Sequence, residues 1–224
     1  MRSILEMLAC GEYVSGERMS EELGISRPAV WKRIAQLKEQ GWQIEAAGRK
    51  GYRLLAGDSL DPRLWVGSLT TRTLGRGDIR YEDTVTSTNT VVKEMHLQGA
   101  PAGSLCLCEM QTAGKGRLGR KWESPAGAGL WQSVLLKPLL SPERAPLITL
   151  CAAMAVARAV EETSGVQPRI KWPNDVIVGK RKLCGILLEM ISDPDAIESI
   201  IVGVGINIRK NAYPPELAER AISL

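Results

Sequence analysis

The chain has 224 residues, which allows one or two domains with a sizeable core. Its formal net charge of +4 is mild and does not by itself indicate a nucleic-acid partner. No apolar run reaches the roughly 18 residues of a membrane span, and acidic residues come too early for a signal peptide. The five cysteines are scattered, without metal-ligand spacing, as is typical of a reducing compartment. We therefore expect a soluble, cytoplasmic protein without a metal site.

The N-terminal part predicts a small helical domain with a basic hairpin. The expected elements are three helices and then two short strands, over residues 3–9, 15–23, 26–40, 42–45 and 51–55. Ser15 and Ser26 are expected N-caps, and the turn between the strands is the basic stretch 48–51. This order is typical of a winged helix-turn-helix domain, whose second motif helix enters the DNA major groove.

Cations concentrate where such a domain meets DNA. Residues 27–53 hold seven cations and two acids, whereas residues 1–26 hold two cations and five acids. Cations on the recognition helix and the wing supply the salt-dependent attraction to phosphates. The alternative is a small helical domain that binds a protein or nothing. The expected DNA-contacting residues are Ser26, Arg27, Lys32, Arg33, Gln36, Arg49 and Lys50.

A turn-rich stretch over residues 56–66 marks the expected boundary between a first domain, 1–60, and a second domain, 65–224. The second domain predicts seven strands, over residues 79–82, 104–110, 130–136, 169–172, 176–178, 183–190 and 200–208. Helices are expected over 86–98, opened by the capping residues 86–89, and over 145–163, with an apolar stripe facing the core. That stripe is Leu147, Leu150, Cys151 and Met154. A strand-rich sheet with a few helices makes this domain α+β.

Residues 111–122 carry three glycines and four cations and end on a tryptophan. Glycine amides can approach a ligand closely, consecutive amides can hold an anion, and arginine donors match carboxylate and phosphate. The pattern Gly114-x-Gly116-x-x-Gly119 does not indicate a Rossmann site, because a strand rather than a helix follows it, and no Walker sequence is present. The stretch predicts an anion-binding loop, and the alternative is a mobile, solvated basic loop.

The second domain shows no nucleophile–base pair, and we expect its single histidine, His96, to be structural. Two like unit charges 4 Å apart repel by about 4 kcal/mol at an effective dielectric of 20, so a carboxylate meets a triphosphate only beside fixed cations. With Mg²⁺ on the phosphates, such a site suits carboxylate activation by a nucleotide. The side chains available for it are Arg117, Arg120, Lys171, Lys182, Asp175, Trp122 and Trp172.

Four motifs occur in the order seen in biotin–protein ligases: GKGRLGRKW (114–122), KWPND (171–175), RKLCGILLE (181–189) and GVGIN (203–207). Together with the winged helix-turn-helix, they make residues 1 to about 208 resemble the bifunctional bacterial type of this family. The resemblance implies a mixed-sheet catalytic domain of the class II synthetase-like, biotin/lipoate ligase type. It also implies residues beyond Leu224 that complete this domain and add a small barrel.

In that family, biotin and Mg·ATP give biotinyl-5′-AMP, and biotin then passes to a lysine of the biotin carboxyl carrier protein of acetyl-CoA carboxylase. The resemblance further implies a homodimer that binds operator DNA and represses biotin synthesis genes, with the adenylate as co-repressor. Three rival interpretations stay open: a ligand-sensing regulator without ligase activity, a lipoate–protein ligase, and an enzyme with a vestigial N-terminal domain.

The resemblance also assigns site residues, motif by motif. The implied catalytic residues are Lys182, Arg117 and Asp175. The implied biotin-binding residues are Ser87, Thr88, Asn89, Gln111, Gly114, Lys115, Gly116, Arg117, Lys182, Gly185 and Leu187. The implied adenylate-binding residues are Arg117, Arg120, Trp122, Asn174, Lys182 and Asn207, with Trp122 stacking on the adenine and Asn207 reading it. No residue is implied as a metal ligand, and segment 210–224 is implied to help enclose the adenylate.

Overall fold

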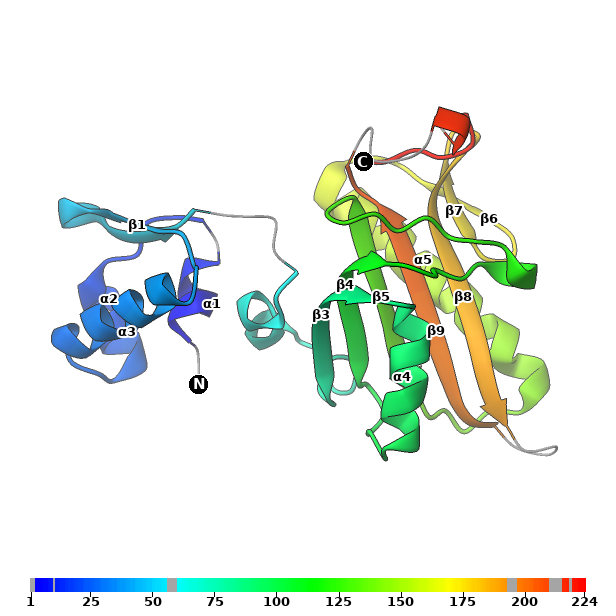
Figure 1. Cartoon of the computed structure of the whole chain (residues 1–224), viewed down its shortest axis with the longest axis horizontal. Helices are drawn as coiled ribbons and strands as arrows, with labels where there is room; N and C mark the ends of the chain where they lie inside the picture. The colour runs from blue at the N-terminus through cyan, green and yellow to red at the C-terminus, as the bar shows by residue number, and fades with distance from the viewer. Residues whose placement is uncertain (1–2, 10, 56–59, 193–196, 210–214, 218) are drawn as a thin grey trace. The chain divides into compact units, whose positions relative to one another are not determined.

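The computed structural model describes residues 3–9, 11–55, 60–192, 197–209, 215–217 and 219–224 (Figure 1). The chain divides into two compact units, Met1–Thr70 and Thr71–Leu224. The first unit extends past the expected boundary because Leu64 packs against its core and the backbone at Gly67 lies against Glu6. No helix within the described ranges is long and apolar enough to cross a membrane.

The first unit has the predicted order of three helices and a two-stranded hairpin. Its elements are α1 (Ile4–Leu8), α2 (Gly16–Leu23), α3 (Arg27–Glu39), β1 (Ile44–Ala47) and β2 (Gly51–Leu54). Met19, Val30 and Ile34 are buried at its centre. The first strand begins two residues later than predicted, because Trp42 donates its backbone N–H to Leu37 O at 3.1 Å and so still belongs to the end of α3.

Serine N-caps determine where these helices begin. The hydroxyls of Ser3, Ser15 and Ser26 each accept a hydrogen bond from the backbone N–H three residues further on. Gly24 ends α2 in the left-handed conformation, with φ of 62°, which glycine adopts without a steric penalty. These local signals make the helix-turn-helix predictable from the chain alone.

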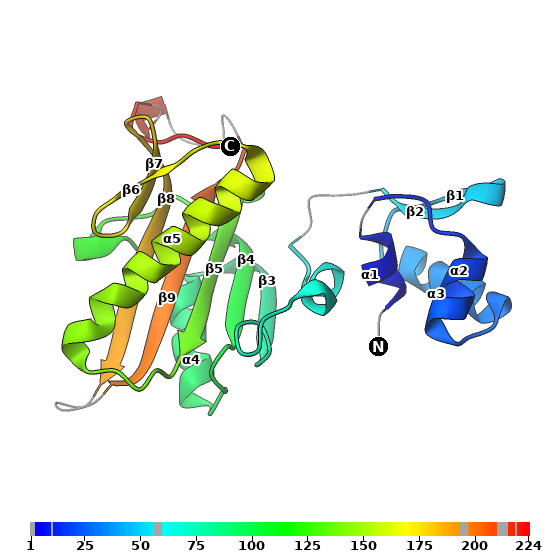
Figure 2. The same cartoon turned by 180° about the vertical axis from the view of Figure 1, so that it is seen from behind.

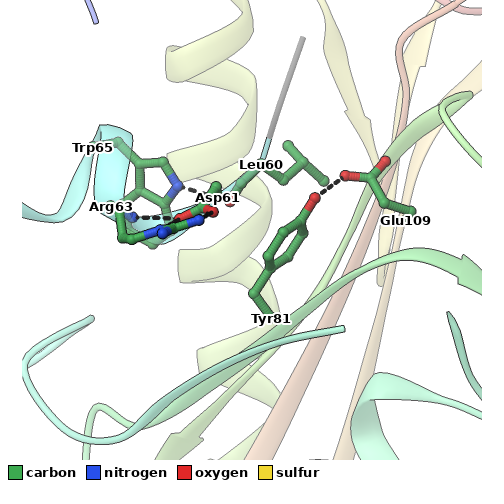
Figure 3. Close-up of polar contacts among 6 residues, drawn as sticks. All are labelled: Leu60, Asp61, Arg63, Trp65, Tyr81 and Glu109. Atoms are coloured by element: carbon green, nitrogen blue, oxygen red, sulfur yellow. Dashed lines mark hydrogen bonds and ion pairs between the residues drawn. The ribbon is translucent and has the colours of Figure 1, made fainter. Parts of the chain in front are cut away.

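The last part of the first unit is tied down by polar contacts (Figure 3). Asp61 accepts hydrogen bonds from the Arg63 guanidinium, one of them at 2.7 Å, and the Trp65 indole donates to Leu60 O at 3.0 Å. Burial acts to raise the pKa of the Asp61 carboxyl, but the hydrogen bonds and charge of Arg63 outweigh it, so this pKa lies below its usual value. The Arg63 guanidinium also stacks 5.0 Å from the centre of the Trp42 ring.

In the second unit, seven strands of the described residues form one mixed sheet in the order β3-β4-β5-β9-β8-β7-β6. β3 and β4 are parallel, and all the other neighbours are antiparallel. The strands are β3 (Ile79–Val85), β4 (Leu105–Gln111), β5 (Gly129–Leu136), β6 (Arg169–Lys171), β7 (Asp175–Val178), β8 (Arg181–Ser192) and β9 (Ile197–Asn207). Tyr81 of the edge strand β3 donates its hydroxyl to Glu109 of β4 (Figure 3).

One helix covers each face of this sheet. Helix α4 (Thr88–Leu97) lies over one face in Figure 1, and α5 (Ala145–Ser164) crosses the other face in Figure 2. Because side chains alternate along a strand, β9 serves both cores: Ile201 packs with the α4 side, whereas Ile200 and Val202 pack with the α5 side. Each face of the sheet therefore carries a hydrophobic core beneath its own helix.

The predicted core stripe of α5 is wrong. Leu147 is 55% exposed, Met154 is 62% exposed, and Cys151 is also exposed. The buried residues of the helix lie on a different stripe, formed by Ala145, Thr149, Ala153 and Val160. Small residues let the helix approach a sheet whose branched side chains already fill the space between them. Helical periodicity alone cannot choose between two apolar stripes on one helix.

Candidate ligand-binding site

Two adjoining cavities lie in the second unit, and most of the implied site residues line them. We call them the inner cavity and the outer cavity. The inner cavity has a polar end formed by Ser87, Thr88, Asn89, Gln111 and Gln132, and a floor that includes Gly185, Leu187, Gly203 and Gly205. The outer cavity measures about 470 Å³ and is lined by Arg120, Asp175 and Asn207 among others. Both cavities are lined by Gly116, Arg117, Trp122, Asn174 and Lys182.

The polar end is built on the first turn of α4. Ser87 occupies the N-cap position, so the helix begins within the expected capping stretch 86–89, but the Ser87 side chain makes no capping hydrogen bond. Instead Gln111, at the end of β4, accepts a hydrogen bond from the Thr88 N–H at 2.9 Å and donates to Ser124 Oγ at 2.7 Å. A side chain from a distant strand therefore caps the helix, and the buried Ser87 side chain faces the inner cavity.

Behind the polar end lies a continuous buried network. Ser133 Oγ lies 2.6 Å from both Thr88 Oγ1 and Asn89 Oδ1. The Asn89 amide in turn donates to Glu189 Oε2 at 2.5 Å. Thr88, Asn89 and Ser133 are all buried, so their polar groups depend on one another for hydrogen bonds. Neither Ser133 nor Glu189 was predicted as a site residue, and neither lines a cavity.

Glycines form the floor because other groups lie directly on the sheet. Gly185 of β8 and Gly205 of β9 are paired across the two strands. A Cβ on Gly205 would lie 2.5 Å from the Trp122 Nε1, and one on Gly185 would lie 2.9 Å from Cζ3 of the same ring. A Cβ on Gly203 would lie 2.3 Å from Asn89 Oδ1. These distances are too short for any side chain, so glycine is required at all three positions.

The cationic loop folds back on itself. The Trp122 N–H donates to Gly114 O at 2.9 Å, and the Gly116 N–H donates to Arg120 O at 2.7 Å. A Cβ on Gly114 would lie 2.3 Å from Trp122 O, which explains the glycine there. Because these amides are paired within the loop, its positive charge towards a ligand comes from the side chains. At its tip Leu118 is 88% exposed.

Cations converge where the two cavities meet. Lys182 Nζ forms an ion pair with Asp175 Oδ1 at 2.7 Å and lies 5.0 Å from the centre of the Trp122 ring. Arg117 Nη1 donates to Asn174 Oδ1 at 3.3 Å. Fixed cations in such a position lower the energy of two anions brought together. Lys115 lines only the inner cavity, and its Nζ lies 3.2 Å from Thr90 Oγ1.

The far wall of the outer cavity comes from the end of the described chain. Asn207 is 2% exposed, and its Nδ2 donates to Lys182 O at 3.3 Å and to Ile222 O at 3.2 Å. Its Oδ1 has no partner within the described part of the chain, so it is available to a donor in the cavity. Segment 215–224 lines the cavity through Glu216, Leu217 and other residues, whereas positions 210–214 and 218 lie outside the described residues.

Several polar residues stay outside both cavities. Lys171 and Trp172 are exposed at the sheet edge, and neither lines the inner or the outer cavity. His96 is buried in α4, with its Nε2 3.2 Å from Glu198 Oε1. Burial raises the pKa of the Cys106 and Cys108 thiols to about 12, so both are protonated at neutral pH. The buried His96, Cys106 and Cys108 therefore contribute to packing, and Lys171 and Trp172 remain at the surface.

The first unit presents a separate polar surface on α3 and the hairpin. Arg27, Lys32, Arg33 and Gln36 are all exposed, opposite the buried side of the helix. Trp31 was not predicted as a contact residue, but it is 66% exposed between these cations. Ser26 uses its hydroxyl as the N-cap of α3, at 3.4 Å from the Ala29 N–H.

The hairpin of the first unit carries further cations. Lys50 is exposed, with its Nζ 5.8 Å from the centre of the Tyr13 ring, whereas the side chain of Arg49 lies outside the described ones. Arg53 pairs with Glu45 at 2.7 Å, so this cation already has a partner on the hairpin.

Sequence comparisons agree with this division into two units. Residues 81–207 match the biotin/lipoate A/B protein ligase family, and residues 1–53 match an HTH domain family. The chain belongs to the biotin/lipoate A/B protein ligase family. The matched segment contains the strands, the cationic loop and the glycine floor that form the two cavities.

Individual relatives combine the same two parts. The chain is 41% identical over 220 residues to a bifunctional ligase/repressor BirA of Bacillus subtilis (strain 168), covering 96% of this chain and 67% of that protein. It is 33% identical over 206 residues to the Escherichia coli (strain K12) protein of the same description, covering 92% of this chain and 62% of that protein. The chain thus spans 62% to 67% of the length of these curated relatives.

The solved structures that resemble the chain include a biotin protein ligase from Aquifex aeolicus in complex with biotin and ATP. The two chains are 34% identical, with a TM-score of 0.55, over 65% of this chain and 59% of that chain. A biotin protein ligase from Leishmania major in complex with biotin is 31% identical, with a TM-score of 0.54. These structures share the catalytic fold of the family with the second unit.

Proposed function

We propose that the protein activates biotin with ATP to biotinyl-5′-AMP and transfers the biotin to a lysine of a biotin carboxyl carrier protein. The observation that carries this proposal is the position of Lys182 and Arg117, which line both cavities at their junction. A carboxylate entering from one side and a triphosphate entering from the other would meet at these cations. The relatives and solved structures named as biotin ligases favour biotin over lipoate as the acid.

Biotin occupies the inner cavity in this proposal. Its ureido ring contacts the polar end, and its apolar part lies beside Leu187 and Trp122, which line the same cavity. The side chains of Ser87, Thr88, Asn89 and Gln111 supply the polar contacts, and Gly116 and Gly185 line the same cavity, whereas Gly114 packs against Trp122 O and lines neither cavity. The carboxylate of biotin then points to Lys182, near Lys115 and Arg117.

The nucleotide occupies the outer cavity. Trp122 offers an aromatic face for the adenine, and the unpartnered Asn207 Oδ1 accepts from its amino group. Arg117 and Arg120 hold the phosphates, and Asn174 positions Arg117. Among the described residues no group of three His, Cys, Asp or Glu side chains could hold a metal ion, so Mg²⁺ would be held mainly by the phosphates of ATP. When bound, Mg²⁺ neutralises charge on the phosphates.

The chemistry needs no general base in its first step. A biotin carboxylate oxygen attacks the α-phosphorus of ATP, the bond to the bridging oxygen breaks, and pyrophosphate leaves. In the second step the amine of the acceptor lysine attacks the acyl carbon, AMP leaves, and the amine loses a proton. Lys182 stabilises the charge that develops on the α-phosphate. Asp175 holds Lys182 in place and lies near enough to orient the acceptor amine.

Adenylate formation tests this proposal. We would incubate the full chain with biotin, Mg²⁺ and α-labelled ATP and follow labelled biotinyl-AMP by chromatography. Lys182→Ala is expected to reduce the rate by about 100- to 1,000-fold, as is usual when a transition-state donor is removed. The matched control is Lys180→Ala, because Lys180 is exposed and lines neither cavity. A parallel incubation with lipoate separates the two acids, and product from lipoate alone would contradict the biotin assignment.

A second function is favoured by the first unit. We propose that it binds operator DNA as part of a homodimer and represses biotin synthesis genes when biotinyl-AMP is bound. The exposed cations of α3 and the hairpin support this proposal, as does the HTH match. Electrophoretic shift assays with and without the adenylate test it, and Lys32→Ala is expected to reduce the slope of log K against log salt by about 1.

The two activities can be contradicted separately. Ligand-dependent DNA binding without adenylate formation would indicate a regulator rather than a ligase, and no DNA binding would indicate an enzyme alone. Sedimentation with the adenylate tests the homodimer. We also propose a cytoplasmic location, supported by the free thiols of Cys106, Cys108, Cys151 and Cys184.

A further inference from the structure

The distances in the buried network behind the polar end favour one direction of hydrogen bonding. We infer that Glu189 determines this direction and thereby makes the inner cavity select a ligand with an N–H donor at Thr88. Glu189 and Ser133 line neither cavity, so both act as positioning residues through Asn89 and Thr88. This inference rests on the proposed function only for the identity of the ligand, because the direction belongs to the protein alone.

The direction starts at the carboxylate. A carboxylate only accepts hydrogen bonds, so the Asn89 atom that lies 2.5 Å from Glu189 Oε2 must be the amide nitrogen. The Asn89 oxygen then faces Ser133, whose Oγ lies 2.6 Å away, and at that distance a proton must lie between the two oxygens. Because an amide oxygen carries no proton, Ser133 donates to Asn89.

Thr88 completes the chain. Its Oγ1 also lies 2.6 Å from Ser133 Oγ, and the single Ser133 proton already points to Asn89. Thr88 must therefore donate its own hydroxyl proton to Ser133. Gln111 Oε1 is a second acceptor near that proton, but it lies 3.2 Å from Thr88 Oγ1, whereas Ser133 Oγ lies only 2.6 Å away and is therefore the stronger partner.

The hydrogen-bond direction determines what Thr88 offers to a ligand in the inner cavity. Since its proton is committed, Thr88 Oγ1 presents only lone pairs to a ligand. A ligand N–H, such as one of the two on the ureido ring of biotin, finds an acceptor there, whereas a ligand oxygen in the same place meets a second acceptor. A site that hydrogen-bonds a donor strongly rejects an isostere without that donor. This discrimination is far larger than the discrimination against a ligand that lacks one methylene group.

Replacing the carboxylate removes the constraint. In Glu189→Gln the new amide can donate to Asn89, so the Asn89 side chain can turn over, with its oxygen towards residue 189. Ser133 would then accept from Asn89 and donate to Thr88, and Thr88 would keep a proton for the ligand. One substitution outside the cavity therefore permits the opposite polarity inside it, with almost no change in shape.

The first test reads the direction in the ligand-free protein. The two side-chain amide protons of Asn89 would be assigned in a ¹⁵N correlation spectrum by their loss in Asn89→Asp. We expect these signals to shift in Glu189→Gln and to stay in place in Glu109→Gln. Glu109 is a suitable control because it is a carboxylate of the same sheet that accepts from Tyr81, away from both cavities. Asn89 signals that do not respond to Glu189→Gln would overturn the inference.

The second test reads selectivity. Biotin would be compared with its two cyclic carbamate analogues, in which one or the other ureido N–H is replaced by oxygen, by calorimetry on the full chain. We expect the wild type to prefer biotin over one of the carbamates by at least about 100-fold. In Glu189→Gln we expect this affinity ratio to fall by at least about tenfold, and in Glu109→Gln we expect it to stay unchanged. The KM for ATP is expected to stay unchanged in both variants.

The outcomes separate the possible failures. If biotin and its analogues all bind more weakly to Glu189→Gln but their affinity ratio stays unchanged, Glu189 has only a structural role. That result would overturn the inference. A ratio that also falls in Glu109→Gln would overturn it as well. A wild type that binds neither biotin nor its analogues would contradict the proposed function, whereas the Asn89 spectrum would still decide the direction of the network.

Discussion

The polar end of the inner cavity and the cationic loop serve opposite ends of the proposed reaction, and they are built in opposite ways. Thr88, Asn89 and Ser133 are buried and hydrogen-bonded to one another. In the loop, by contrast, Arg117 and Arg120 are exposed. The first region is held together by its own buried hydrogen bonds, whereas the second exposes its charged side chains to solvent.

From this difference we expect a division of labour, in which the polar end determines which ligand binds and the loop determines how fast it reacts. A preorganised, buried polar site discriminates between ligands, because an unmatched group there stays without a hydrogen bond. An exposed loop with flexible cations discriminates little, but it can close over bound anions and stabilise charge. Variants at the polar end should therefore change which ligand binds, whereas variants in the loop should change how fast the ligands react.

The largest effect is expected at the floor beneath the polar end. In Gly203→Ala the new methyl group would overlap Asn89 Oδ1, which lies 2.3 Å from the ideal Cβ position. We expect biotin affinity to fall by about 100-fold and the free energy of unfolding to fall by about 1–3 kcal/mol, as is typical of overpacking. Calorimetry and urea unfolding measure the two. Gly16→Ala is the control, because its Cβ would meet only an ordinary contact at 3.7 Å; normal binding by Gly203→Ala would argue against a rigid polar end.

In the loop, Arg120→Ala should slow adenylate formation without changing the affinity for biotin. Arg120 lines only the outer cavity, so biotin affinity should stay within about twofold, whereas the rate of adenylate formation should fall by about tenfold, as for one charge-assisted hydrogen bond. Single-turnover kinetics and biotin titration measure both values. Arg72→Ala, at another exposed arginine outside both cavities, should change neither. Weaker biotin binding by Arg120→Ala would contradict the division of labour.

Limited trypsin digestion tests the difference in rigidity. The loop offers Lys115, Arg117, Arg120 and Lys121 as exposed cleavage sites. We expect cleavage there in the free protein, and slower cleavage by about tenfold or more when biotin and ATP are present at about ten times their dissociation constants. Mass spectrometry of the fragments gives the position and the rate. Equal cleavage rates with and without ligands would mean that the loop does not close over them.

The smallest effect on function concerns the thiols under the cavities. Burial raises the pKa of Cys106, Cys108 and Cys184 to about 12, so at pH 8 these thiols are protonated as well as inaccessible. Iodoacetamide at pH 8 should therefore label the exposed Cys151 and leave these three unlabelled until the protein is unfolded. Peptide mapping reads the labels, and ligase activity should survive the treatment. Rapid labelling of Cys184 would show that the sheet beneath the site opens readily.

Much of the molecule follows from the sequence by itself. Ser15 and Ser26 open their helices as predicted, because an N-cap hydrogen bond joins residues only three positions apart. The glycine-rich cationic loop likewise predicted an anion-binding site, and the structure places its Arg117 and Arg120 in the lining of the cavities. Such features depend on local geometry or on residue type, and both can be read from a short stretch of chain.

Only the tertiary structure decided the rest. It placed a different stripe of α5 in the core, and it brought Gln111 of β4 to the first turn of α4, where Gln111 accepts the Thr88 N–H. It also joined Asn89 to Glu189, although they are 100 residues apart in the chain. A contact of this kind exists because the sheet brings α4 and β8 together, and no local propensity encodes it. The selectivity of the inner cavity depends on such contacts. Glu189 can only accept a hydrogen bond, and this determines the hydrogen-bond direction through Asn89 and Ser133 to Thr88 in the cavity.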